Sequence, residues 1–169
     1  IDAIRNNTVT EEFTKQQLDT AKALFELAVI NIDELASSSN FESFIAELEA
    51  TSNEITDKIF EYWSTNNNLA IEFKIDQIHR QNQQPEKILD IRVKNNRHRI
   101  TLPLKNRSKG FNWFFSFIVW FSKIQDEKDK NFILLLDEPG LNLHASAQAD
   151  LLRFINDLSD NYQIVYSTH

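Results

Sequence analysis

The sequence contains no cysteine and no methionine, only two glycines and three prolines, and no apolar run long enough to cross a membrane. Without cysteine, the chain cannot hold disulfides, thiolate-bound metals or a cysteine nucleophile, which fits a reducing compartment. The longest largely apolar stretch, Phe111 to Phe121, suits a buried helix. No signal-peptide pattern opens the chain. We therefore expect a cytoplasmic protein with no membrane partner.

The 169-residue chain begins with Ile1, whereas translated proteins begin with methionine, so we expect a piece of a longer protein. Its length suits one domain, or one domain with a sizeable insertion. Hydrophobic residues make up 41% of the chain and include 13 phenylalanines, which is enough to build a substantial core.

Charge is divided unevenly along the chain. Residues 1–64 carry 13 acidic and 4 basic side chains, which makes this part a poor candidate for binding nucleic acid. In contrast, residues 92–109 contain seven Lys or Arg and no acid. This basic pattern fits a solvated hairpin surface slightly better than an anion-binding face, and both interpretations stay open.

Two amphipathic helices are predicted within residues 1–64. Thr10 is suited to cap the first, and apolar residues then recur at helical spacing as far as Leu35. Ser39 and Glu42 form a capping box for the second helix. Because a short polar loop joins the two, we expect an inserted antiparallel helical hairpin.

The periodicity of apolar residues changes from 3.6 to 2 after residue 64. Three alternating runs predict strands with one solvent-facing side: Ile71, Phe73 and Ile75; Leu89, Ile91 and Val93; Ile100 and Leu102. Asn95 and Asn96 suit a tight turn between the last two strands, because asparagine tolerates a positive φ. We expect a small antiparallel meander.

The rest of the chain predicts a helix, a strand, a second helix and a second strand. Ser108 and Gly110 open the first helix, which is apolar nearly all round and therefore buried. The run FILLL (132–136) is expected to be a central parallel strand covered on both faces, and YQIVYSTH (162–169) a second buried strand. The helix between them makes a right-handed crossover, so the two strands are parallel and the fold class is α/β.

Polar residues follow both of these strands. Asp137 and Glu138 follow the first, and a Ser-Thr-His sequence at 167–169 ends the second. Ligands of open α/β sheets bind beyond the carboxyl ends of the strands, so these groups are expected to converge. An Asp there can hold Mg²⁺ while the Glu orients or deprotonates water, and His169 can hydrogen-bond a phosphate or the Glu. Pro139 favours an extended backbone at Glu138. The alternative to a catalytic site is that Asp137 and Glu138 simply form an ordinary connection from a strand to a turn.

The stretch FILLLDEPGLNLHASAQADLL resembles the Walker B motif and D-loop of ABC-type ATPases, in the branch shared by SMC-like proteins and the overcoming-lysogenization-defect (OLD) family. RSKGFNWFFSF lies where that branch has its signature motif, and YSTH resembles the strand that carries the switch histidine. The resemblance covers about residues 105–169. It implies a P-loop NTPase-like partial head with parallel core strands, beside the antiparallel meander and the N-terminal helical hairpin.

The resemblance also implies roles for individual residues. Asp137 assists Mg²⁺ binding, Glu138 activates the attacking water, and His169 senses the γ-phosphate of ATP. Two groups are expected to meet a second subunit. The signature residues contact the γ-phosphate of the ATP that the second subunit holds: Ser108, Lys109 and Gly110. The loop that crosses the dimer interface contains Leu141, Asn142, Leu143 and His144. The helix N-terminus offers free N–H groups to an anion, although Ser108 can also merely cap a core helix and His144 merely pack within its loop.

Two features depart from the family pattern. The signature reads Ser-Lys-Gly in place of Ser-Gly-Gly. The P-loop, which needs G-x-x-x-x-G-K-[ST], is absent, because Gly110 and Gly140 are the only glycines. In the family the P-loop lies N-terminal to an insertion, so we expect residues 65–169 to be the distal lobe of a head and residues 1–64 its helical insertion. We expect this chain alone to bind ATP weakly or not at all.

Three functions from different classes follow. The first is a fragment of an ATP-hydrolysing head that closes as an ATP-sandwiched homodimer. In the intact protein this head would serve DNA processing or phage defence, and the DNA-directed task is implied by the resemblance alone. The second is a helical interaction module on a degenerate lobe that does not hydrolyse ATP. The third is a metal-dependent phosphodiesterase that uses Asp137 and Glu138 directly, which is the weakest because such sites usually need more carboxylates.

Overall fold

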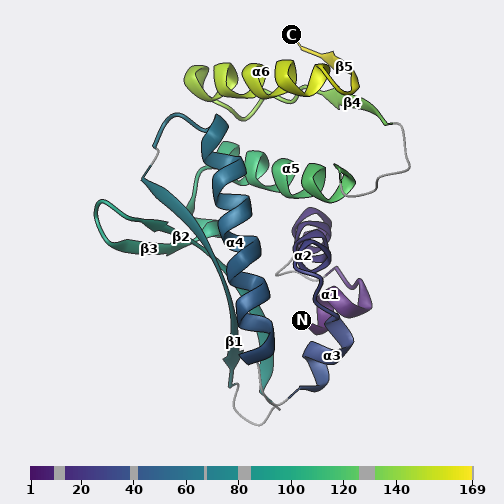
Figure 1. The fold of residues 1–169 in the computed structure, drawn as a ribbon, viewed down its shortest axis with the longest axis vertical. Helices are drawn as coiled ribbons and strands as arrows, with labels where there is room; N and C mark the ends of the chain where they lie inside the picture. Colours follow the sequence, from purple (N-terminus) through teal and green to yellow (C-terminus); the bar gives the residue numbers. More distant parts are fainter. Residues whose placement is uncertain (10–13, 39–41, 67, 80–84, 126–131, 169) are drawn as a thin grey trace.

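The computed structural model describes residues 1–9, 14–38, 42–66, 68–79, 85–125 and 132–168. The chain has a mixed α/β fold in which the long helix α4 (Glu42–Tyr62) runs through the middle (Figure 1). An antiparallel sheet lies on one side of α4 and short helices lie on the other, while α6 (Ala145–Ser159) and a parallel strand pair form the end that carries the C-terminus. The expected α/β fold class is confirmed.

The helical part differs from the expected hairpin of two long helices. It contains α1 (Asp2–Asn6), α2 (Lys15–Leu27), α3 (Ile32–Ser37) and α4. Helix α2 packs chiefly against α5 (Lys109–Gln125), whereas α4 packs chiefly against strand β1 (Leu69–Ile78). The two longest helices of this part therefore have separate main partners.

A capping box opens α2 later than the sequence suggested. Thr14 Oγ1 accepts a hydrogen bond from the Gln17 N–H (3.3 Å), and the Gln17 side chain accepts one from the Thr14 N–H (2.9 Å). The predicted caps at Thr10 and Ser39 lie outside the described residues.

The predicted first helix is broken between α2 and α3. Val29 adopts a left-handed φ of 55°, and α2 ends just before it. Asn31 then caps α3, because its Oδ1 accepts hydrogen bonds from the N–H groups of Asp33 and Glu34 (2.9 and 3.3 Å). Apolar residues on both sides of the break face the same core, so the apolar pattern conceals the break, although Asn31 is a recognisable cap.

Strands β1, β2 (Glu86–Asn95) and β3 (Ile100–Pro103) form the expected antiparallel meander in the order β1-β2-β3. The register pairs Ile71 with Val93, and Val93 in turn with Leu102. Ile71 and Val93 are buried, as predicted, but Leu102 and its strand neighbour Ile100 are exposed. The β2–β3 hairpin projects from the body, and no described helix covers its end (Figure 1).

The turn between β2 and β3 also differs from the prediction. Asn95 is still part of β2, and the connection occupies residues 96–99. The positive φ belongs to Arg99 (56°) and not to either asparagine. Asn95 instead stabilises the turn through its Oδ1, which accepts a hydrogen bond from the His98 N–H (3.0 Å).

Helix α4 protects the edge of β1 that faces away from β2. Ser52 Oγ donates a hydrogen bond to the Ile71 carbonyl, and Thr56 Oγ1 accepts one from the Ile71 N–H (2.9 Å). Hydroxyl groups of a helix therefore satisfy backbone groups that another strand would otherwise pair with. These bonds fix α4 along β1.

A short 3-10 helix, η1 (Leu104–Asn106), leads into α5, and strands β4 (Ile133–Asp137) and β5 (Gln163–Ser167) flank α6 in the chain. The two strands are parallel, as predicted. Their expected burial on both faces is wrong, because Leu134 is buried whereas Ile133, Leu135 and Val165 are 62%, 75% and 53% exposed. Among the described elements, only one face of this two-stranded sheet has neighbours.

An aromatic cluster on α5 ties the layers together. The buried Phe114 ring lies 5.3 Å from the Trp63 ring and 6.1 Å from the Phe154 ring. Trp63 follows α4 and Phe154 lies on α6, so α4, α5 and α6 meet at this ring. The prediction of a buried helix holds for most of α5, although Trp120 is 45% exposed.

Candidate active site

Asp137 and Ser167 meet at the carboxyl ends of β4 and β5. The two residues are register partners, and Ser167 Oγ donates a hydrogen bond of 2.5 Å to Asp137 Oδ1. Both residues are exposed. The predicted convergence of the two strand ends is therefore confirmed for this pair. His169, the predicted third member, lies outside the described residues.

The chain turns sharply at Glu138, which opens the post-β4 loop (residues 138–144). The φ of Glu138 is 45°, a left-handed value that is uncommon outside glycine, so the extended backbone predicted from Pro139 is wrong. Hydrogen bonds explain the difference: the Glu138 N–H donates to the Ser167 carbonyl (3.2 Å), and the Glu138 carbonyl accepts from the Leu141 N–H (3.0 Å). Strained residues of this kind cluster at functional sites.

The far end of the post-β4 loop is fixed to α6. His144 Nδ1 accepts a hydrogen bond from the Ala147 N–H (3.3 Å), which caps the helix, and its ring lies 6.3 Å from the Trp63 ring. Gln148 Nε2 donates to the Gly140 carbonyl (3.2 Å). These contacts support the interpretation of His144 as a loop-packing residue, while its contact across a dimer stays a prediction.

Ser108 caps α5. Its Oγ accepts a hydrogen bond from the Phe111 N–H (3.2 Å), and its carbonyl accepts one from the Asn112 N–H (3.0 Å). The capping role is thus confirmed, and contact of Ser108 with a phosphate stays a prediction. Lys109 is exposed, and the Arg107 guanidinium lies 5.3 Å from the centre of the Phe111 ring.

Gly110 is buried where α5 meets the post-β4 loop. A Cβ atom added there would lie 2.6 Å from the Asn142 carbonyl oxygen and 2.8 Å from Leu143 Cδ2. Only a glycine permits such a close approach of helix and loop backbone. The structure therefore brings the predicted signature helix and the predicted dimer-crossing loop into direct contact within one chain.

Replacing Gly110 with alanine is expected to lower the free energy of unfolding by about 1–3 kcal/mol, because the loop backbone must move to admit the methyl group. Denaturant unfolding of the chain measures this change. Gly140→Ala is the matched control, since a Cβ there meets only the Gln148 side chain, at 3.6 Å or more. The control is expected to change stability by less than about 0.5 kcal/mol. Equal losses in the two variants would contradict the close-contact explanation.

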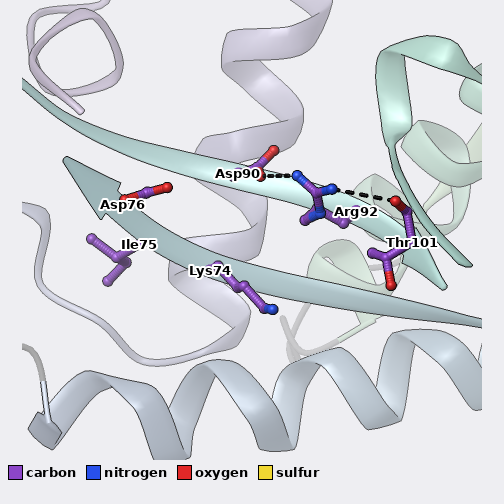
Figure 2. Close-up of a pocket in the computed structure, with 6 residues that line it drawn as sticks. All are labelled: Lys74, Ile75, Asp76, Asp90, Arg92 and Thr101. Carbon is purple, nitrogen blue, oxygen red and sulfur yellow. Dashed lines mark hydrogen bonds and ion pairs between the residues drawn. The ribbon is translucent and has the colours of Figure 1, made fainter. Parts of the chain in front are cut away.

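The basic segment (residues 92–109) begins on the outer face of the meander. Figure 2 shows Arg92 donating to the Asp90 carboxylate (2.9 Å) and to the Thr101 carbonyl (3.3 Å). These three residues line an open polar groove together with Lys74, Ile75 and Asp76. Because Asp90 on the same strand balances Arg92, and Glu72 on β1 balances Lys94, this part of the segment is a solvated surface.

Sequence reasoning missed two residues that support the loop, Trp63 and Asp150. Both are buried, and Asp150 occupies a position in the apolar stripe of α6, beside Leu151 and Phe154. A carboxyl group within an apolar stripe was the available signal. Burial, with the nearby Glu61 and Asp157 carboxylates, raises the pKa of the adjacent Tyr62 hydroxyl.

Two features are absent from the part of the chain that the structure describes. No group of three or more His, Asp or Glu side chains lies together in a way that would hold a metal ion without further ligands. None of the described helices is both long enough and apolar enough to cross a membrane.

One curated relative shares sequence with most of this chain. The protein MJECL43 of Methanocaldococcus jannaschii, described as uncharacterized, is 30% identical over 122 residues, which is 69% of this chain. The chain spans only 29% of the length of that relative.

Several solved structures have a related arrangement. One, from work on ATP-driven dimerization and DNA-stimulated activation of SMC ATPases, has a TM-score of 0.47 and 17% identity, over 76% of this chain and 73% of its own. The SmcHead bound to the C-winged helix domain of ScpA has a TM-score of 0.49 and 19% identity, over 88% of this chain and 44% of its own. A Smc head from Pyrococcus furiosus has a TM-score of 0.45 and 16% identity, over 94% of this chain and 44% of its own.

The sequence pattern of a whole family covers nearly the entire chain. The family described as the AAA ATPase domain matches residues 2–169. Its match runs through the helices, the meander, the start of α5 and the strand ends that hold Asp137 and Ser167. This chain therefore belongs to the AAA ATPase domain family and has a mixed α/β, P-loop NTPase-type fold.

Proposed function

We propose that this chain is the distal part of an ATP-hydrolysing head centred on Asp137 and Glu138. The strand-end geometry carries the proposal. Asp137 is the last residue of β4 and accepts a 2.5 Å hydrogen bond from Ser167, while Glu138 lies on the left-handed turn that follows. The two neighbouring acids therefore have different backbone environments.

The oxygen atoms at this strand end fit Mg²⁺, which in turn would bind the phosphates of ATP. Mg²⁺ binds one or two carboxylates and keeps several waters, and Asp137 and Ser167 present a carboxyl and a hydroxyl group side by side. Asp137 would hold the ion, which supplies positive charge to the phosphates when bound. Glu138 would orient the attacking water and take its proton. His169 is proposed to hydrogen-bond the γ-phosphate.

The exposed face of the β4–β5 sheet supports a larger head. Ile133, Leu135 and Val165 form an apolar surface on the side that no described element covers. We assign this surface to a P-loop segment of the same polypeptide, because this chain spans only 29% of its archaeal relative. Residues 65–169 would then be the distal lobe, with residues 1–64 as a helical insertion.

Two exposed segments support an ATP-sandwiched homodimer. The start of α5, with Ser108 and Lys109, offers N–H groups and a positive charge to a phosphate of the second subunit. The post-β4 loop exposes Leu141 and Asn142, and Leu141 is 72% exposed. A loop of this kind can bury these side chains against its copy. A DNA-directed task in the cytoplasm is proposed from the family resemblance.

Light scattering of the complete protein tests this dimer. ATP with Mg²⁺ is expected to raise the mass from one copy to two, and Ser108→Arg to prevent this while ATP still binds, because the larger cation blocks the phosphate contact. Ser159→Arg, on an exposed end of α6, is the control and should dimerise normally. A Ser108→Arg protein that dimerises with ATP like the wild type would contradict the proposed interface.

The alternative functions give different results in the same preparation. A helical interaction module on a degenerate lobe would neither bind nor hydrolyse ATP. A phosphodiesterase would cut nucleic acid with Mg²⁺ or Mn²⁺ in the absence of nucleotide, and Asp137→Asn would abolish that cleavage.

A further inference from the structure

A buried carboxyl group joins the end of α4 to the middle of α6. Asp150 is only 4% exposed, and its Oδ2 accepts a hydrogen bond from the Ser64 N–H (2.8 Å). Its Oδ1 accepts one from Arg153 (3.2 Å), which also donates to the carbonyl of Tyr62, the last residue of α4 (2.6 Å). One acid thus organises the bonds that tie α4 to α6.

Trp63 lies between these two attachment points. It is buried, and its ring packs 5.2 Å from the Phe111 ring and 5.3 Å from the Phe114 ring, both on α5. Its ring also lies 6.3 Å from the ring of His144, the last residue of the post-β4 loop. The bond from Ser64 to Asp150 and the bond from Arg153 to Tyr62 therefore hold, on either side, the residue that touches both α5 and this loop.

The post-β4 loop is held from two directions. Its last residue meets Trp63, and its middle, Asn142 and Leu143, meets Gly110 at the start of α5. Its first residue is Glu138, whose carbonyl accepts a bond from the Leu141 N–H (3.0 Å). The loop therefore links the contact of Trp63 to the turn at Glu138, which is also held by the bond from its N–H to the Ser167 carbonyl (3.2 Å).

We propose that Asp150 is a positioning residue that couples the end of α4 to the post-β4 loop and thereby to Glu138. A buried acid is costly unless its hydrogen bonds are made, and an apolar residue would fill this site in α6 with less difficulty. Asp150 thus fixes one arrangement of α4, α5 and the loop. The consequence for hydrolysis rests on the proposed ATPase function, whereas the coupling itself does not.

Hydrogen exchange in Asp150→Asn tests the coupling without any nucleotide. Asparagine has nearly the same shape as aspartate, but its NH₂ group is a donor. It would therefore face either the Ser64 N–H or Arg153, which are donors themselves, and that hydrogen bond is lost. The amides of Leu141 and Leu143, which are bonded within the loop, are expected to exchange about tenfold faster, while those of α2 stay unchanged. Asp160→Asn, exposed beyond the far end of α6, is the control and should leave both regions unchanged.

Two outcomes would overturn the coupling. In the first, the loop amides exchange at the wild-type rate. In the second, the amides of the loop and of α2 exchange faster by the same factor, which indicates only global destabilisation. If Asp150→Asn does not fold, Arg153→Leu provides the test, because it removes the bonds of Arg153 to the Tyr62 carbonyl and to Asp150 and leaves the Ser64 bond in place. The same selective increase in loop exchange is expected from it, and no increase would overturn the coupling.

Turnover of the complete protein tests the positioning of Glu138. Asp150→Asn is expected to lower kcat about tenfold with the affinity for ATP unchanged, because the loop loses its position and no ATP-binding group is removed. A normal kcat despite faster loop exchange would overturn the positioning role. A wild-type protein without ATP turnover would instead overturn the proposed function, and hydrogen exchange alone would then decide the coupling.

Discussion

The Glu138→Gln variant of the complete ATPase is expected to bind ATP like the wild type and to hydrolyse it about 100- to 10,000-fold more slowly. Glutamine preserves the size of the side chain and the hydrogen-bonding pattern of the turn, but its amide cannot take a proton from water. Asp137 and the phosphate-binding segment are unchanged, so ATP affinity is retained. Phosphate release measures the rate, and equilibrium titration measures the affinity.

Glu49→Gln is a suitable control for this experiment, because Glu49 is exposed on α4. It removes the same charge far from the strand end and should leave turnover unchanged. If Glu138→Gln hydrolyses ATP within about twofold of the wild-type rate, Glu138 is not the general base. If the variant loses ATP binding as well as turnover, its role is in holding the nucleotide.

The Phe114→Ala variant is expected to lose about 3–5 kcal/mol of stability. Phe114 is fully buried, and its ring contacts those of Trp63 and Phe154, so the change opens a cavity between α4, α5 and α6. A chain of this size has a total stability of about 5–15 kcal/mol, so the variant approaches unfolding at ordinary temperatures. Thermal unfolding should show a Tm lower by about 6–20 °C.

Trp120→Ala, on the same helix, is the matched control. Trp120 is the larger side chain, but it is 45% exposed and stacks at the edge of the cluster, 6.3 Å from Phe117. Its loss is expected to cost about 1 kcal/mol. If the two variants unfold at the same temperature, the junction of α4, α5 and α6 is not the main source of stability in this part of the chain.

Local patterns predict elements well wherever one face of an element meets the core. Ile71 and Phe73 alternate with polar residues in β1 and are buried as expected. Such patterns say less about which elements pack together. Helix α2 packs against α5 instead of α4, because the same apolar stripe serves either partner. The left-handed Val29 divides the first predicted helix, and no glycine in the sequence marks this position.

The candidate site likewise has features that the sequence predicts and features that depend on distant contacts. The meeting of Asp137 with the end of β5 follows from parallel pairing alone, so the sequence predicts it. The left-handed φ of Glu138 accompanies hydrogen bonds that its N–H donates to Ser167, 29 residues away on β5. The backbone preference set by the following Pro139 does not include such a distant partner. The bond between Asp150 and Ser64 joins residues 86 positions apart, and only the packing of α4 against α6 brings them together.

The strand pair β4–β5 also affects how the isolated chain behaves at high concentration. Each strand is short, rich in branched apolar residues and almost free of charge, and in the described part of the chain neither outer edge is paired. Exposed edges of this kind template strand addition from neighbouring molecules, as in cross-β aggregates. Concentrated samples of the chain should therefore assemble edge to edge into open-ended aggregates that form without nucleotide and enrich in β-structure.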